Sequence, residues 1–250
     1  MENQMDNQYL TIAMDVGEML LKYGAETSRI EDTIRRICTA YGASRVDVFS
    51  ITVNIETTMH MGYDTYTQNR RIRSSKMDTE RLSALNQLSR DICEKKPSLM
   101  TVENQLKVIE AMPNYSYSFQ MASYALISGS FCLFFGGTLQ DMIAASIIGA
   151  LLKPVETCVQ RYSQNKLFIA LAWSLAGGLL NALFLYIGIG QHYDLIAIGN
   201  IMILIPGLAF TNGLRDLFVG DSITGLIHLV EAIIVAICIA LGFVFVQSFF

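Results

Sequence analysis

The first forty residues alternate apolar and polar positions with a helical period. One apolar stripe runs over Tyr9–Tyr23 and a second over Ile30–Tyr41, and a glycine follows each of them. Gly24 therefore predicts a left-handed helix end. Ser28 and Glu31, three residues apart, have the form of a capping box at the start of the second stripe. We predict two helices joined by a tight corner.

The period then shortens to two, which predicts strands. Apolar and polar residues alternate to Glu56, and one strand is expected to bury Phe49, Ile51, Val53 and Ile55. Gly62 is expected to turn the chain into a second strand that ends at Ile72. Two further helical stripes follow, one broken by Pro97 and one ending before Pro113.

Beyond Phe119 the chain becomes strongly apolar. A helix that spans the hydrocarbon core of a membrane needs about 20 apolar residues. Five segments are candidate spans, the second of them short: Phe119–Phe135, Met142–Leu152, Leu167–Gly188, Leu195–Phe210 and Ile223–Phe245. The predicted fold class is a membrane protein. An N-terminal cytoplasmic α+β domain, residues 1–115, precedes an α-helical bundle of about five transmembrane spans, residues 116–250.

Composition agrees with this division. Of 250 residues, 52% are hydrophobic and only 16% are charged, and most of the 18 Lys+Arg and 22 Asp+Glu precede Ser118. A formal net charge of -4 gives no indication of a nucleic-acid partner. The first ten residues lack a secretory signal, so we expect the N-terminal domain to stay in the cytoplasm.

Loop charges predict the topology of a multi-pass protein of the plasma or inner membrane. The loop Lys153–Lys166 carries three basic residues, Gly190–Asp194 carries none, and Arg215 lies in the next loop. Basic loops stay on the cytoplasmic side, so the C-terminus is expected outside. The five cysteines and three histidines are scattered, which predicts no metal site, no cofactor and no enzymatic site.

The stretch Leu204–Ser222 carries polar residues between two apolar segments. Pro206 and Gly207 are expected to break the fourth span, and Asn212, Arg215 and Asp216 follow, all three within one and a half helical turns of each other. Interrupted spans of this kind form solute sites in transporters, so these five residues are the candidate substrate-binding residues. The alternative is a short cytoplasmic loop in which Arg215 only follows the positive-inside rule.

Other ionisable and polar residues lie within the predicted spans. His228 and Glu231 share one face of the fifth segment and, with Asp216, are candidates for proton coupling. At the membrane interface, His228 and Glu231 would need no such role. Asn181 and Asn200 would bond either solute or a neighbouring helix.

Two polar clusters lie in the N-terminal domain. Glu26 and Arg29 follow Gly24 at a helix start, where free N–H groups bind anions, although a capped helix corner is the more common explanation. Arg70 and Arg71 begin a basic run that suits anionic lipid or an anionic solute, or is simply a solvated strand end.

Three motifs resemble the threonine/serine exporter family: GAETSRIEDTIRRI (Gly24–Ile37), RRIRSSKMDTERLSALNQLSR (Arg70–Arg90) and PGLAFTNGLRDLFVGDSITGL (Pro206–Leu226). The resemblance implies a cytoplasmic domain fused to a bundle that exports small amino or carboxylic acids as a secondary transporter. The residues that match these motifs are Gly24, Glu26, Arg70, Pro206, Gly207, Asn212, Asp216 and Gly220.

Full-length members of that family carry about ten spans, and five are predicted here. The chain therefore resembles the larger component of split exporters, including succinate exporters, in which a second membrane subunit supplies the remaining spans. Small-molecule solute and the lipid bilayer are the other expected partners. The alternatives are a membrane-anchored hydrolase, which lacks a nucleophile–base spacing here, and an assembly or sensor subunit of another transporter.

Overall fold

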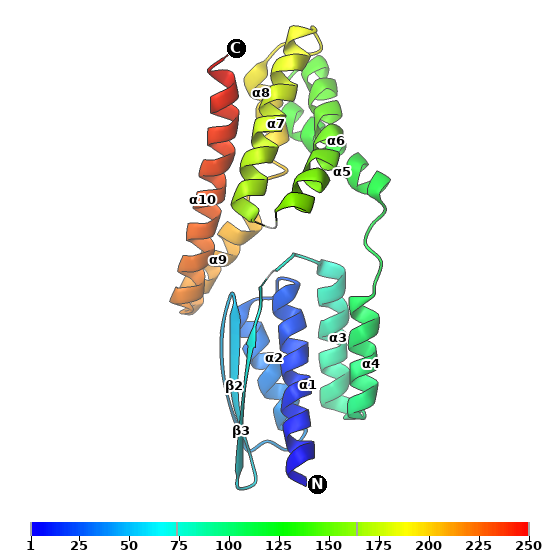
Figure 1. Ribbon diagram of the computed structural model, residues 1–250, viewed down its shortest axis with the longest axis vertical. Helices are drawn as coiled ribbons and strands as arrows, with labels where there is room; N and C mark the ends of the chain where they lie inside the picture. Colours follow the sequence, from blue (N-terminus) through cyan, green and yellow to red (C-terminus); the bar gives the residue numbers. More distant parts are fainter. Residues whose placement is uncertain (1, 74, 164, 250) are drawn as a thin grey trace. The chain divides into compact units, whose positions relative to one another are not determined.

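The computed structural model describes residues 2–73, 75–163 and 165–249, which divide into two compact units (Figure 1). The first unit comprises the chain up to Pro113 together with Arg215–Ile227. The second comprises Asn114–Leu214 and His228–Phe250.

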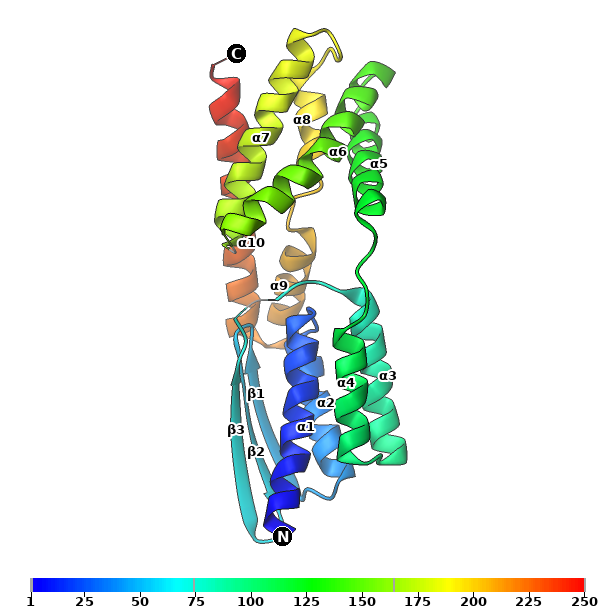
Figure 2. The same cartoon turned by 45° about the vertical axis from the view of Figure 1, so that its right-hand side comes forward.

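The first unit is an α+β fold of three layers. Its elements are α1 (Glu2–Lys22), α2 (Thr27–Ala40), β1 (Arg45–Ile51), β2 (Asn54–Met61), β3 (Asp64–Arg71), α3 (Thr79–Lys95) and α4 (Leu99–Glu110). Helices α1 and α2 cover one face of the antiparallel sheet β1-β2-β3, and α3 and α4 pack on the other side of those helices (Figure 2). The core of this unit lies between the sheet and the helices.

The corner between α1 and α2 forms where the sequence predicts it, but its cap differs. Gly24 has φ +87°, which confirms the left-handed helix end. The predicted capping box of Ser28 and Glu31 is wrong, because α2 begins at Thr27 with Glu26 at its N-cap position. The Glu31 carboxylate instead accepts hydrogen bonds from the backbone N–H and the hydroxyl of Ser50, at 2.8 and 3.1 Å, and so joins α2 to β1.

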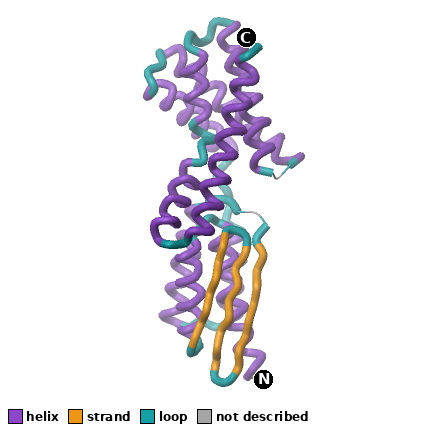
Figure 3. The backbone as a smooth tube through the Cα atoms, turned by 90° about the vertical axis from the view of Figure 1, so that its left-hand side faces the viewer, coloured by secondary structure: helices purple, strands orange, loops and turns teal. Residues whose placement is uncertain are grey.

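The predicted single strand from Phe49 to Glu56 is wrong, because a turn at residues 52–53 divides it into β1 and β2 (Figure 3). Ile51 pairs with Asn54, so the inward positions change from even numbers on β1 to odd numbers on β2. Phe49 is consequently 55% exposed, whereas Ser50 is 4% exposed and Ile55 is fully buried. The turn at Gly62 and the strand that follows it are confirmed.

Three described helices, which lie wholly or mostly in the second unit, are long and apolar enough to cross a membrane, by length and composition: α6 (Leu139–Tyr162), α7 (Lys166–Tyr186) and α10 (Ser222–Gln247). The unit also contains α5 (Tyr117–Phe134), α8 (Tyr193–Ile201) and most of α9 (Gly207–Val219). The chain is therefore a membrane protein.

The five predicted apolar segments overlap these helices with two differences in bounds, and only α6, α7 and α10 are long and apolar enough to count as spans, so a total of five spans stays a prediction. The second segment is longer than its apolar run Met142–Leu152, because α6 continues through Lys153 and Glu156. These two side chains form an ion pair of 2.7 Å, and the Tyr124 hydroxyl donates to Glu156, which offsets the cost of charge there. The fourth segment is divided between α8 and α9.

Candidate functional site

The interruption between α8 and α9 is the centre of the candidate site. It covers residues 202–206 and ends at Pro206, which has no N–H to donate to the Met202 carbonyl four residues earlier. The predicted break in the helix is confirmed, because α8 ends at Ile201 and α9 begins at Gly207, whereas the prediction that this segment is a membrane span is not tested. Since α8 has 9 residues, it is about 13.5 Å long, roughly half of a ~30 Å hydrocarbon core. The interruption therefore lies near mid-depth if α8 begins at the membrane surface.

Three fully buried side chains around this interruption carry polar atoms without a hydrogen-bond partner in the described residues. They are the Ser128 hydroxyl on α5, the Trp173 indole N–H on α7 and the Asn200 amide oxygen at the end of α8. The Asn200 amide nitrogen donates to the Ile196 carbonyl at 3.1 Å. Such atoms are rarely left without a partner, because each unsatisfied group costs about 1–3 kcal/mol.

Glycine contacts place Ser128 between two helices. A Cβ atom at Gly199 of α8 would lie 2.5 Å from the Ser128 carbonyl oxygen, and one at Gly149 of α6 would lie 2.4 Å from its hydroxyl. Helices α5, α6 and α8 therefore pack backbone to backbone at this level. Glycine at positions 149 and 199 leaves the space that the Ser128 hydroxyl and carbonyl occupy.

Trp173 belongs to the same part of the unit. It lies in an apolar cluster with Cys132, Ile148 and Ile196, and Ile203 and Leu204 of the interruption pack against that cluster. A donor from Trp173, an acceptor from Asn200 and a hydroxyl from Ser128 thus belong to the part of the unit that contains the broken helix. This combination can bind a small solute that has both donors and acceptors.

A second polar pair lies at the other end of α8. The Asn181 amide nitrogen donates to the Tyr193 carbonyl at 2.8 Å, so Asn181 joins α7 to α8, one of the two roles expected for it. The Asn181 amide oxygen and the Tyr193 hydroxyl are buried without a partner among the described residues.

Asp141 is a fully buried carboxylate that the sequence analysis did not select. It forms a capping box with Thr138 at the start of α6. It also accepts from the backbone N–H groups of Gln191 and His192, at 2.7 and 3.1 Å, and lies 2.9 Å from the His192 ring Nδ1. Because its oxygens are fully used, Asp141 fixes the loop before α8 and is not free to bind solute. The spacing Thr138-x-x-Asp141 before an apolar run was the available signal.

The candidate residues of the stretch Leu204–Ser222 lie on α9. Residues 207–219 are helical, so most of this stretch is not a loop. Asn212 and Asp216, four residues apart, share one face of α9, and Asp216 is 5% exposed. Arg215 pairs with both carboxylate oxygens of Glu26, a residue of the same compact unit.

Of the proton-coupling candidates on α10, Glu231 lies beside the first residue of α7. Glu231 is 3.8 Å from the ammonium of Lys166, the first residue of α7, and its side chain is 53% exposed. His228 is half-buried, one turn before Glu231 on the same helix face. This position favours the interfacial interpretation of Glu231.

The N-terminal candidates Arg29 and Arg70 have different partners. Arg29 donates to the Asn86 amide oxygen of α3 at 3.1 Å. Arg70 lies 3.5 Å from Asp15 and 3.6 Å from Glu18 on α1, whereas Arg71 is exposed. Burial raises the pKa of Asp15, although the Arg70 guanidinium lowers it in part. Arg70 is therefore held by α1 and does not join Arg71 in one basic surface.

The described residues contain no group of three or more His, Cys, Asp or Glu side chains that could hold a metal ion. A family model described as "Putative threonine/serine exporter" matches residues 11–250. No curated protein and no solved structure matches the chain. The family match includes α2–α10 and most of α1. The chain belongs to the threonine/serine exporter family.

Proposed function

We propose that this protein is one subunit of a secondary transporter that exports small amino acids or carboxylic acids, with threonine and serine as the first candidates and succinate-like acids as the second. Membership in a family of exporters supports transport rather than catalysis. The three long apolar helices support a membrane location, which we take to be the plasma or inner membrane with several spans.

The observation that carries the proposal is the broken helix bordered by unpaired buried groups. Ser128, Trp173 and Asn200 leave a hydroxyl, a donor and an acceptor without partners in the described residues. Transporters of several folds bind solute where a span is interrupted near mid-membrane. Threonine and serine add a hydroxyl to the ammonium and carboxylate of every amino acid, so they match this set of donors and acceptors well.

The residues of α9 extend this site in the proposal. Pro206 and Gly207 create the interruption, and Asn212 and Asp216 face the translocation path from one side of α9. Arg215 has its guanidinium on Glu26, so neutralising an acidic neighbour explains it better than contact with a substrate carboxylate. Asp216 remains the first proton-coupling candidate, ahead of Glu231 and His228.

The chain is proposed to act with a second membrane subunit. In transporters built from inverted repeats, each repeat normally contributes a broken helix. A chain of about five spans supplies only one such repeat and so only one broken helix. The N-terminal domain, residues 1–115, is proposed to lie in the cytoplasm and the membrane part, residues 116–250, to end outside.

The test is efflux from cells that lack related exporters and are preloaded with labelled threonine, serine or succinate. We expect efflux of at least one solute when the chain is expressed with a small membrane protein of the same family, and none from the chain alone. Absence of efflux for every solute with both subunits at normal membrane abundance would contradict export. Efflux from the chain alone would contradict the need for a partner.

The same assay separates the two candidate sets of ionisable residues. Asn212→Ala and Asp216→Asn are expected to reduce efflux about tenfold or more, whereas Glu231→Gln and His228→Gln are expected to leave it within about twofold. The opposite result would move the translocation path from α9 to α10. Arg215→Gln is expected to have an intermediate effect because it releases Glu26 without removing a solute contact.

A further inference from the structure

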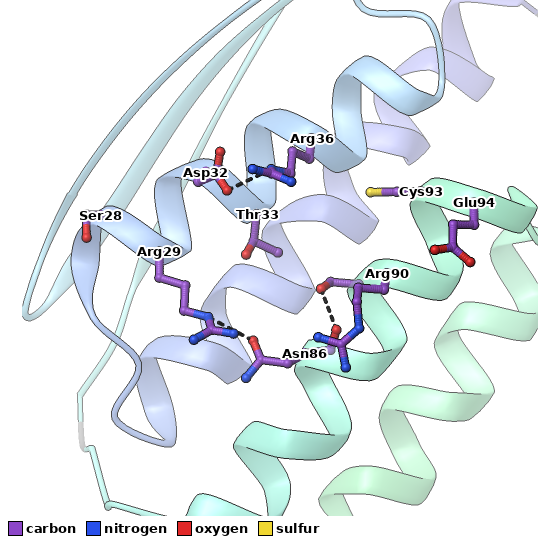
Figure 4. Close-up of a pocket in the computed structure, with 10 residues that line it drawn as sticks. Ser28, Arg29, Asp32, Thr33, Arg36, Asn86, Arg90, Cys93 and Glu94 are labelled. Carbon is purple, nitrogen blue, oxygen red and sulfur yellow. Dashed lines mark hydrogen bonds and ion pairs between the residues drawn. The ribbon is translucent and has the colours of Figure 1, made fainter.

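A groove between α2 and α3 of the first unit has the size of a small-molecule site. Its volume is about 710 Å³, within the range of about 300–1,000 Å³ usual for ligand pockets. Residues of two of the three family motifs meet there: Ser28, Arg29 and Asp32 come from α2, and Asn86 and Arg90 come from α3 (Figure 4). Glu94 of α3, which follows the second motif, also lines the groove. All six are distant in sequence from the interruption between α8 and α9. They belong to the first compact unit, whereas the interruption belongs to the second.

Two guanidinium groups in this groove have only neutral hydrogen-bond partners in the described residues. Arg29 donates to the Asn86 amide oxygen at 3.1 Å, and Arg90 donates to the Gln87 amide oxygen at 2.6 Å. Arg36 differs, because its guanidinium is 2.7 Å from the Asp32 carboxylate. Arg29 and Arg90 therefore leave two positive charges that no carboxylate of the described residues balances by a salt bridge.

The two charges lie close to one position in the groove. Arg90 is four residues after Asn86 and shares its face of α3, and Arg29 reaches Asn86 from α2. Figure 4 shows both guanidinium groups directed toward Asn86. Guanidinium groups bind carboxylates and phosphates through paired hydrogen bonds, so this end of the groove suits an oxyanion.

The rest of the groove favours a carboxylate that also carries a cationic or hydroxyl group. Glu94 lies one turn beyond Arg90 on the same face of α3, and the Ser28 hydroxyl lies on the α2 side. An ammonium or hydroxyl group could contact these oxygens while the carboxylate meets Arg29 and Arg90. Burial raises the pKa of the Cys93 thiol despite the nearby Arg36, so the groove does not present a thiolate nucleophile.

We propose that the groove between α2 and α3 binds a small carboxylate-bearing solute, at a site separate from the interruption in the membrane helices. Arg29 and Arg90 hold the carboxylate, and Glu94 holds the polar end of the molecule. A solute bound there contacts both α2 and α3 and therefore stabilises their packing, which gives the first unit a way to respond to solute.

The test is isothermal titration calorimetry of the purified full chain carrying Asn200→Ala, which is designed to weaken the site at the interruption. The probes are L-threonine, L-serine, succinate and inorganic phosphate. We expect saturable binding of at least one of the carboxylates. Adding Arg29→Gln with Arg90→Gln should weaken that binding about tenfold or more, because charge-assisted hydrogen bonds are lost.

Arg35→Gln is the matched control, since Arg35 is an exposed residue of α2 outside the groove, and it should leave the affinity within about twofold. The proposal is overturned if none of the carboxylates binds, if phosphate alone binds, or if the two sets of variants bind equally. Export can fail in its own assay without changing any of these outcomes, so the two proposals are tested separately.

Discussion

A substitution at Ser128 can separate a structural role from a functional one, because it should affect stability and efflux differently. Its buried hydroxyl has no partner in the described residues, so Ser128→Ala removes an unsatisfied group and is expected to leave the free energy of unfolding unchanged or raise it by up to about 1 kcal/mol. Loss of one solute hydrogen bond should nevertheless reduce efflux about fivefold to tenfold. Thermal unfolding and efflux, measured on the same variant, check this. Ser130→Ala, at an exposed position of α5, should change neither.

Asp141 is expected to be a structural residue. Asp141→Asn replaces one carboxylate oxygen by an NH₂ group that faces the N–H donors of either Thr138 or the loop before α8. We predict a loss of about 3 kcal/mol in stability, seen as a lower midpoint of thermal unfolding. Asp194→Asn, an exposed change near the start of α8, should cost less than about 0.5 kcal/mol. Equal midpoints for the two variants would show that the Asp141 network contributes little.

Residue roles were predictable from the sequence where they depend only on the local backbone conformation. Gly24 was identifiable because only a glycine enters the left-handed region readily at a helix end. Ser128 and Trp173 were not, because a serine or a tryptophan within an apolar helix has no local signal of its partners. The significance of Ser128 depends on Gly149 and Gly199, which bring three helices into contact across distant parts of the chain.

At the scale of elements, the interruption between α8 and α9 should depend on Pro206. Pro206→Ala restores an N–H that can donate to the Met202 carbonyl, and alanine favours a continuous helix by about 3 kcal/mol relative to proline. We predict that efflux falls about tenfold or more while membrane abundance is retained. The control is Pro154→Ala, since Pro154 lies inside the continuous helix α6. Normal efflux with Pro206→Ala would mean that the broken helix is not needed for transport.

Helices were more predictable than strands in this chain. The apolar stripes of α3 and α4 are confirmed by the burial of Leu85, Ile92, Val102 and Ile109, because a helical period tolerates small errors in its bounds. The alternation from Phe49 to Ile55 led to a wrong prediction of one strand, because a turn at residues 52–53 reverses which positions face the core. The length of α6 was underestimated because its apolar run ends before Lys153 and Glu156. These two residues form an ion pair within the helix, which a search for apolar residues does not detect.

At the scale of the whole molecule, the loop charges predict which side of the membrane each loop faces. In a cysteine-free background, a membrane-impermeant maleimide applied to intact cells should label Gln140→Cys and spare Ser75→Cys, both of which are exposed positions. Lysed cells should label both, which controls for reactivity. Labelling of Ser75→Cys alone in intact cells would reverse the proposed topology.

The most direct test of the central claim, that solute binds at the interruption between α8 and α9, uses the only tryptophan of the chain. Trp173 is fully buried beside the interruption and has an unpaired indole N–H in the described residues. Titrating the purified chain with L-threonine, L-serine or succinate should therefore give a saturable change in tryptophan fluorescence for the solute that is exported. The change should be lost or shifted to at least tenfold higher concentration in Asn200→Ala, and kept in Arg29→Gln/Arg90→Gln. A fluorescence change that Asn200→Ala leaves intact, or no change with any solute, would contradict the account.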